Sequence, residues 1–331
     1  MRLCRTILPA ATLALIAALQ TGPSAWAQSS RANAAYRGAI VVDATSGRVL
    51  FEDHADEVSP PASMTKLMTF AVLDDRIRSG AFTLQTPITA TAADARVGML
   101  KDSTSVWLKT GETFPVEELI YAMMIQSAND AAYTLAHASA GSVPAFVEWM
   151  NAKARALGMN HTTFRSPNGL PPPSRRIADG DLTTPRDFAI LCRYLLLRTD
   201  ILKYTSVRSR AFGAGRRFPP TMMTNHNHLL GRIAGVDGLK TGFTSGAGFC
   251  LSATALRNGH RIIAVMMDSP DSQSRDLKIA QLIERGFAID SIVVPPVSVP
   301  APSAGAANSS APKAAPAGNT GIQFSVPGLS Q

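Results

Sequence analysis

Strand-like and helix-like segments follow one another along the chain in an order that restricts the possible folds. Residues 38–52 contain two short apolar runs around a turn, which predicts a β-hairpin. Three further strands are predicted near the other end, at residues 236–244, 249–256 and 261–267. Helical patterns fill the region between. Strands from both ends are therefore expected to share one sheet with helices packed over it, an α+β fold.

Apolar residues recur at three- and four-residue steps in the middle of the chain and near its end. Such helices are predicted at residues 116–125, 130–140 and 277–287. Another begins after Thr184, a natural N-cap, with Pro185 suited to the first turn and Asp187 completing the cap. Pro61 can stand only at the start of a helix, so a further helix is expected after it.

The first 27 residues resemble a secretory signal peptide. Arg2 and Arg5 precede an apolar run at residues 8–19, and residues 25–27 read Ala-Trp-Ala, a small-x-small cleavage site. The apolar run is shorter than the roughly 20 residues that a membrane span needs. We therefore expect cleavage and export, with no clear membrane anchor left afterwards.

Composition divides the remainder of the chain in two. Residues 35–290 carry the strand and helix patterns and are predicted to form one domain. Residues 291–331 are rich in Pro, Ala and Ser, so they cannot bury enough apolar surface to fold and are predicted to be disordered. The net charge of +8 includes no basic run with interleaved aromatic residues, which argues against a nucleic-acid partner.

Two cysteines and two histidines raise the question of cross-links and metals. Cys192 and Cys250 could pair in an oxidising compartment, but they lie in apolar helix and strand patterns, so two buried thiols are the simpler expectation. His226 and His228 have a spacing that can bind zinc. No clear third ligand stands nearby, so neither a metal nor another cofactor is predicted.

Three short polar motifs occur in a fixed order. They are S-x-x-K at residues 63–66, S-x-N at 127–129 and K-T-G at 240–242. Each alone arises by chance and has an ordinary structural explanation, such as a helix cap or an exposed face. All three in order, each on the expected element, indicate a serine nucleophile site.

The first motif explains how a serine can become reactive. Positions three apart lie on one helix face, so Lys66 can reach the hydroxyl of Ser63. A lysine removes that proton only when it is neutral, and burial beside a second cation such as Lys240 lowers its pKa. At the start of the helix, the backbone N–H of Ser63 is free to stabilise the oxyanion that forms after attack.

The second motif supplies two polar groups. Ser127 is expected to pass a proton towards the leaving amine, and Asn129 can donate and accept at once to orient a substrate backbone. These are catalytic and substrate-binding roles respectively. Residues 127–129 fall between two predicted helices, so they are expected in a loop or at a helix entrance.

The third motif lies on a predicted strand, which can pair with an extended peptide if it is at the sheet edge. Gly242 leaves room for a ligand to approach the backbone. Lys240 and Thr241 can hold a terminal carboxylate by charge and hydroxyl. The backbone N–H of Phe243 would then be the second oxyanion donor.

At these residues the sequence resembles the low-molecular-mass penicillin-binding proteins, the serine D-Ala-D-Ala carboxypeptidases of peptidase family S11. The resemblance covers roughly residues 35–289 and includes the stretches 61–69, 166–171, 235–244 and 247–251. It implies a penicillin-binding protein/β-lactamase-like fold, with a five-stranded antiparallel sheet flanked by helices and a helical subdomain. It also implies Ser63 as nucleophile, Lys66 as general base, and Ser127 and Lys240 in supporting roles.

The resemblance implies removal of the terminal D-Ala from peptidoglycan stem peptides, inhibition by β-lactams, and a place in the periplasm or at the cell wall. A D,D-endopeptidase, a β-lactamase and a non-catalytic wall-binding protein are the alternatives. Class A β-lactamases deacylate with a glutamate; the candidate, Glu148, lies in an apolar helix pattern, and no Glu occurs at residues 151–240. Ser63 and Lys66 are both present, which argues against a non-catalytic protein.

The chain departs from the family in three places. The Pro/Ala/Ser-rich segment stands where many members have a second β domain and an amphipathic anchor. Phe243 replaces a tyrosine or histidine, which a backbone donor tolerates. Residues 225–228 read Asn-His-Asn-His where some members have an arginine, so carboxylate recognition is expected to depend more on Lys240 and Thr241.

Overall fold

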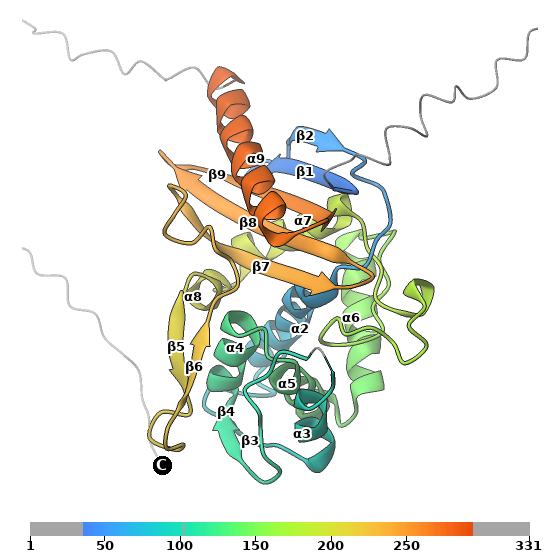
Figure 1. Ribbon diagram of the computed structural model, residues 1–331, viewed down its shortest axis with the longest axis vertical. Helices are drawn as coiled ribbons and strands as arrows, with labels where there is room; N and C mark the ends of the chain where they lie inside the picture. Colours follow the sequence, from blue (N-terminus) through green and yellow to red (C-terminus); the bar gives the residue numbers. More distant parts are fainter. Residues whose placement is uncertain (1–35, 102, 294–331) are drawn as a thin grey trace, which may run out of the picture. The chain divides into compact units, whose positions relative to one another are not determined.

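The computed structural model describes residues 36–101 and 103–293. Five strands form the main sheet: β1 (Gly38–Asp43), β2 (Val49–Asp53), β7 (Val236–Thr244), β8 (Gly248–Arg257) and β9 (His260–Ser269). The helices are α2 (Lys66–Arg78), α3 (Ala92–Gly98), α4 (Val116–Ile125), α5 (Asn129–Ala140), α6 (Val143–Leu157), α7 (Pro185–Arg198), α8 (Leu202–Thr205) and α9 (Ser272–Val293), with 3-10 turns η2 (Ala62–Thr65) and η3 (Ile177–Asp179). Figure 1 shows their arrangement.

Strands from both ends of the chain share the main sheet, as the sequence predicts. Their order is β2-β1-β9-β8-β7, and every neighbouring pair is antiparallel. The fold is therefore α+β with a five-stranded antiparallel sheet, which confirms the predicted class. Strand β7 lies at one edge, so the K-T-G motif has a backbone edge that faces no other strand of this sheet.

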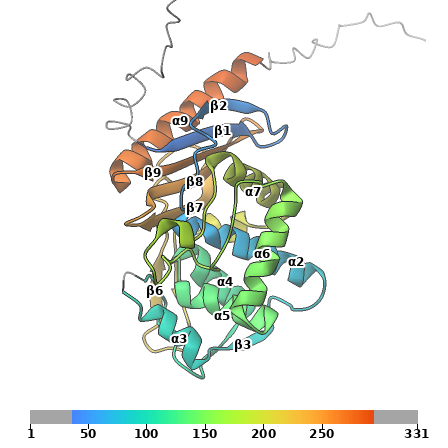
Figure 2. The same ribbon diagram turned by 90° about the vertical axis from the view of Figure 1, so that its right-hand side faces the viewer.

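Both faces of the sheet are buried, which explains why its central strands are apolar without interruption. On β9, Ile263 and Val265 belong to a core shared with α2 and α7, whereas Ile262 and Ala264 belong to a second core against α9. Figure 2 shows α9 on one side of the sheet and the helices α2, α4, α5 and α6 on the other. One face of the sheet thus packs against the helical part, and the other face packs against α9.

Helix α2 runs through the middle of the helical part. Its residues from Lys66 to Leu73 are all buried, and it packs against α4, α5, α6 and α7. The turn η2, which leads into α2, contacts both β7 and β8. This packing brings the start of α2 directly beneath the edge strand that carries the K-T-G motif.

Several elements differ from the sequence prediction. The short ribbons β3 (Pro87–Thr89) with β4 (Thr113–Pro115), and β5 (Ser209–Phe212) with β6 (Thr221–Thr224), were not predicted, because strands of three or four residues show too little alternation. Helix α9 is longer than predicted at both ends and continues to Val293, beyond the boundary expected at residue 290. The expected division into leader, domain and tail stays a prediction, since residues 1–27 and 294–331 lie outside the described residues.

Two smaller expectations concern thiols and membranes. Cys192 on α7 and Cys250 on β8 are both buried and unpaired, and burial raises the pKa of each thiol to about 12. The two thiols are therefore buried and unpaired, as the sequence predicts.

Within residues 36–101 and 103–293, none of the helices combines the length and apolar character that crossing a bilayer requires.

Candidate active site

The nucleophile motif begins in a tight turn rather than in a regular α-helix. Ala62, at a φ of 48°, opens the 3-10 turn η2, and Lys66 begins α2. Side chains three apart eclipse one another in a 3-10 helix, so the turn stacks Ser63 over Lys66. A positive φ at a non-glycine residue costs free energy and is typical of functional sites.

The amine of Lys66 is fully buried and has three polar partners. Its Nζ lies 2.9 Å from Oγ of Ser63, 2.7 Å from Oδ1 of Asn129 and 2.7 Å from the carbonyl oxygen of Asn168. The amide and carbonyl oxygens can only accept hydrogen bonds. A neutral amine has two N–H donors and one lone pair, so it satisfies both acceptors and still has a lone pair for the hydroxyl proton of Ser63.

The electrostatic surroundings favour that neutral amine. Burial, and then the charge of Lys240, lower the pKa of Lys66 well below its ordinary value, against the opposing effect of Asp181 and Asp130. Burial and the neighbouring Arg275 lower the pKa of Lys240 itself to about 7. These effects favour the neutral amine of Lys66, which is the form that can accept the proton of Ser63.

The S-x-N motif contacts the amine of Lys66 through Asn129. Asn129 is the first residue of α5; its Oδ1 accepts from Lys66, and its Nδ2 donates to Oγ of Ser103 at 3.0 Å. Ser127 has a φ of 61°, and its carbonyl accepts from Oγ1 of Thr104 at 2.9 Å. The motif is thus held in an unusual backbone conformation by the segment 103–108.

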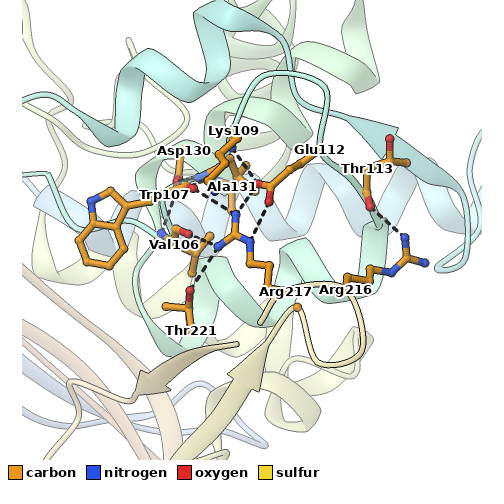
Figure 3. Close-up of polar contacts among 12 residues, drawn as sticks. Val106, Trp107, Lys109, Glu112, Thr113, Asp130, Ala131, Arg216, Arg217 and Thr221 are labelled. Atoms are coloured by element: carbon orange, nitrogen blue, oxygen red, sulfur yellow. Dashed lines mark hydrogen bonds and ion pairs between the residues drawn. The ribbon is translucent and has the colours of Figure 1, made fainter. Parts of the chain in front are cut away.

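Segment 103–108 is itself anchored from two sides, as Figure 3 shows. On one side, the carboxylate of Asp130 accepts from the backbone N–H groups of Val106 and Leu108 at 3.3 and 3.0 Å. On the other, Arg217, from the loop between β5 and β6, donates to the carbonyls of Val106 and Trp107 and pairs with Glu112. Sequence reasoning identified none of these supporting residues.

Two glycines pack closely against the turn at residues 61–65 that carries Ser63, called the nucleophile turn below. A Cβ on Gly242 of β7 would lie 2.5 Å from the carbonyl oxygen of Pro61. A Cβ on Gly169 would overlap the carbonyl oxygen of Ala62, and Gly169 also has a φ of 78°. Only glycine permits these approaches, so the third motif and the loop at 166–170 both fix the position of Ser63.

These residues converge on a cleft of about 270 Å³. Its walls include the predicted site residues Ser63, Ser127, Asn129, Thr241, Gly242 and Phe243. The side chains of Lys66 and Lys240 are buried behind it, and Nζ of Lys240 donates to the carbonyl of Thr241 at 3.1 Å. The residues of the three motifs, together with Phe243, therefore come together in or directly behind one cleft.

Arg275 of α9 also lines the cleft, although no sequence pattern pointed to it. It is only 4% exposed, and its guanidinium bonds the Asp276 carboxylate at 2.7 and 2.9 Å. A single arginine in a long helix belongs to no recognisable motif. The guanidinium of Arg275 stays charged and lies at the cleft wall, paired with the carboxylate of Asp276.

Both histidines line the cleft. Burial, followed by the charges of Lys240 and Lys66, lowers the pKa of His226 to about 4, so it is neutral at neutral pH. His228 contacts Asp276 at 3.0 Å. Over the residues that the structure describes, no three His, Cys, Asp or Glu side chains are grouped to hold a metal ion.

Comparisons with known proteins identify close similarities. The family model for D-alanyl-D-alanine carboxypeptidase, Peptidase_S11, matches residues 25–271. D-alanyl-D-alanine carboxypeptidase DacF of Bacillus subtilis is 30% identical over 254 residues, which is 76% of this chain and 62% of the relative. The chain thus spans about 62% of the length of such curated relatives.

Two other similarities extend over most of the matched protein. A D-alanyl-D-alanine endopeptidase of Escherichia coli is 32% identical over 273 residues, 78% of this chain and 81% of the relative. Penicillin-binding protein D2 of Listeria monocytogenes, solved in an ampicillin-bound form, is 32% identical with a TM-score of 0.66. That match covers 76% of this chain and 97% of the Listeria protein.

Gly169→Ala and Gly158→Ala form a matched pair that tests the close approach at the nucleophile turn. Both glycines have a left-handed backbone, with φ of 78° and 80°, which costs an L-residue about 1–2 kcal/mol. A Cβ at Gly158 meets nothing within 4 Å. Because the Gly169 variant must also displace the Ala62 carbonyl, we expect it to lose about 1–3 kcal/mol more unfolding free energy in urea. Equal losses would contradict the tight contact.

Proposed function

The chain belongs to the D-alanyl-D-alanine carboxypeptidase family, peptidase family S11, and we propose that it removes the C-terminal D-alanine of peptidoglycan stem peptides through an acyl-enzyme on Ser63. One observation carries this proposal. The buried amine of Lys66 lies 2.9 Å from the Ser63 hydroxyl, with its other two partners both acceptors. That arrangement suits a neutral base next to a serine nucleophile.

Acylation follows from this geometry. Oγ of Ser63 attacks the carbonyl carbon between the two D-alanines while its proton moves to Nζ of Lys66. The backbone N–H groups of Ser63 and Phe243 stabilise the oxyanion. As the C–N bond breaks, Ser127 relays a proton to the leaving amine, so free D-alanine departs and an ester remains on Ser63. Water then attacks the ester and restores the hydroxyl.

The terminal carboxylate of the substrate is held by Arg275 with help from Thr241. Both line the cleft, whereas Lys240 lies behind it with a pKa lowered to about 7. A partly neutral lysine is a weaker anchor than a guanidinium, which stays charged and can bind a carboxylate through two parallel bonds. Lys240 instead acts by depressing the pKa of Lys66.

β-Lactams are the expected covalent inhibitors. They present a reactive amide carbonyl and a carboxylate, which are the two groups that Ser63 and Arg275 would receive. The Listeria relative with ampicillin bound supports this assignment for the family. Glu148, the one glutamate considered for rapid deacylation, is exposed on α6 and does not line the cleft. Slow release of the penicilloyl ester follows.

An endopeptidase is the second candidate, because the Escherichia coli endopeptidase aligns over most of its length. The same nucleophile, base and oxyanion donors would cut a D-alanyl cross-link. The two activities differ in the group that leaves, so release of D-alanine from a monomeric peptide and cleavage of a cross-linked dimer distinguish them when compared on one preparation.

Export to the periplasm or the cell wall is part of the proposal. Its support is the leader-like pattern of residues 1–27 and the location of the substrate class outside the cytoplasm. The mass of the protein recovered from the periplasmic or culture fraction decides the point. A chain that begins at Gln28 supports export, and an uncleaved cytoplasmic chain contradicts it.

Removal of the nucleophile or the base tests the proposed chemistry. Ser63→Ala should abolish covalent labelling by a fluorescent penicillin, and Lys66→Ala should slow labelling about 10²–10⁴-fold because the hydroxyl loses its base. Gel fluorescence and D-alanine release from an acyl-D-Ala-D-Ala peptide provide the two measurements. Ser79→Ala, at an exposed serine on the C-terminal side of α2, is the control and should match the native protein. Labelling of Ser63→Ala would refute the assignment.

Arg275 can be tested with a substrate that lacks the carboxylate. Loss of a charge-assisted hydrogen bond costs about 1.5–3 kcal/mol, so Arg275→Gln should lower kcat/KM for the free peptide about 10–100-fold. The C-terminal amide of the same peptide cannot form that ion pair, so its kcat/KM should hardly change in the variant. An equal loss for the acid and the amide would show that Arg275 serves the fold and not the carboxylate.

A further inference from the structure

A second cavity of about 870 Å³ adjoins the active-site cleft. The two hollows share Gly169, Leu170, Phe243 and Thr244 in their walls, so they are neighbours. The second cavity is much the larger, and the acylation steps derived above make no use of it. Its outer wall is the loop 170–180, which follows the glycine that contacts the nucleophile turn.

Loop 170–180 is stiff and presents two arginines. Residues 171–173 are consecutive prolines, which fix the backbone at low entropic cost. Arg175 has a φ of 58°, and its N–H donates to the carbonyl of Pro172 at 2.9 Å. The next residue, Arg176, leads into η3, and Oγ of Ser174 donates to the Asp179 carboxylate at 2.8 Å. Both arginines line the second cavity.

The direction of the bound peptide leads into this cavity. The carboxylate end of the substrate is fixed near Arg275 and Thr241, which line only the first cleft. The residues on the acyl side of Ser63 must therefore leave the cleft at its other end, past Phe243 and Thr244. An extended chain advances about 3.3 Å per residue, so the residues before D-Ala-D-Ala enter the second cavity directly.

The wall of the second cavity is apolar with a positive rim. Phe243 stacks on Phe249 at 4.2 Å between ring centroids, and Leu170 and Ile177 add aliphatic surface. Within the described part of the chain, the guanidinium of Arg176 has one long contact, 3.8 Å to Asp179, with 77% of its side chain exposed. Arg175 is also exposed, so both side chains can be reached by a ligand.

The one carboxylate in the lining does not cancel this charge. Asp181 is buried and accepts hydrogen bonds from Oγ1 of Thr65 at 2.7 Å and from the N–H of Arg165 at 2.6 Å. Its carboxylate oxygens are thus bonded to protein donors behind the cavity wall. Burial also raises the pKa of its carboxyl, which disfavours the negative charge.

We propose that the second cavity binds the donor arm of the substrate, meaning the residues that precede D-Ala-D-Ala, and that Arg175 and Arg176 select donor arms with carboxylate side chains. This inference rests on the proposed function, because it takes Ser63 as the point of acyl transfer. The apolar wall contacts the aliphatic part of the arm, while the arginines pair with its carboxylates. The substrate class is an anionic peptide ending in D-Ala-D-Ala.

Two isosteric peptides test the proposal. Acetyl-L-glutamyl-D-Ala-D-Ala carries a carboxylate in the donor arm, and acetyl-L-glutaminyl-D-Ala-D-Ala carries a neutral amide of the same shape. The ratio of their kcat/KM values isolates recognition of that charge. In the double variant R175E/R176E, this ratio should fall about tenfold, because both attractions become repulsions. In the native protein, the ratio should also fall as salt is raised, since ions screen the exposed arginines.

The control is R155E, which reverses an exposed arginine on the last turn of α6, outside both hollows. Its ratio should equal the native one. Cleavage of the neutral glutaminyl peptide reports separately on the catalytic residues, because that peptide has no donor-arm carboxylate for the arginines to bind. A double variant that cleaves the glutaminyl peptide but keeps the native ratio would overturn the donor-arm proposal alone. A native protein that cleaves neither peptide would contradict the proposed function and this inference with it.

Discussion

A buried amine with two fixed acceptors and one hydroxyl is the interaction on which the rest of the site depends. Burying the ammonium form of Lys66 would be costly, and the fold reduces that cost by favouring the neutral form. Asn129 and the carbonyl of Asn168 use the two N–H groups of that form. The lone pair is left facing Ser63, so the packing that stabilises the helical part also creates the base.

The surrounding elements keep that geometry in place. Gly169 and Gly242 let two backbones press on the nucleophile turn, while Asp130 and Arg217 hold the segment that supports Ser127 and Asn129. Two buried cations lie beside the cleft. The charge of Lys240 lowers the pKa of Lys66, and we propose that Arg275, which lines the cleft, binds the carboxylate of the substrate.

The sequence predicted those parts of the molecule that have a local signature. The three-residue spacing of Ser63 and Lys66, the cap at Thr184 and the apolar strands 236–244, 249–256 and 261–267 depend on neighbouring residues, and each is found as expected. Arg275 and Arg217 act across large separations; the bond from Arg217 to Val106 joins residues 111 positions apart. No periodicity records such a contact, so these residues, like the second cavity, emerge only from the folded chain.

The most direct test is a titration of the Lys66 side chain itself. Protein labelled with ¹³C at the lysine Cε is followed by NMR from acid to alkaline pH, and Lys66→Met identifies the resonance by its loss. The account predicts a midpoint far below the ordinary lysine value of about 10.4, and a midpoint that rises in Lys240→Met, because a neighbouring positive charge is gone. A Lys66 resonance that titrates at the ordinary value, unaffected by Lys240, would contradict the neutral-base mechanism.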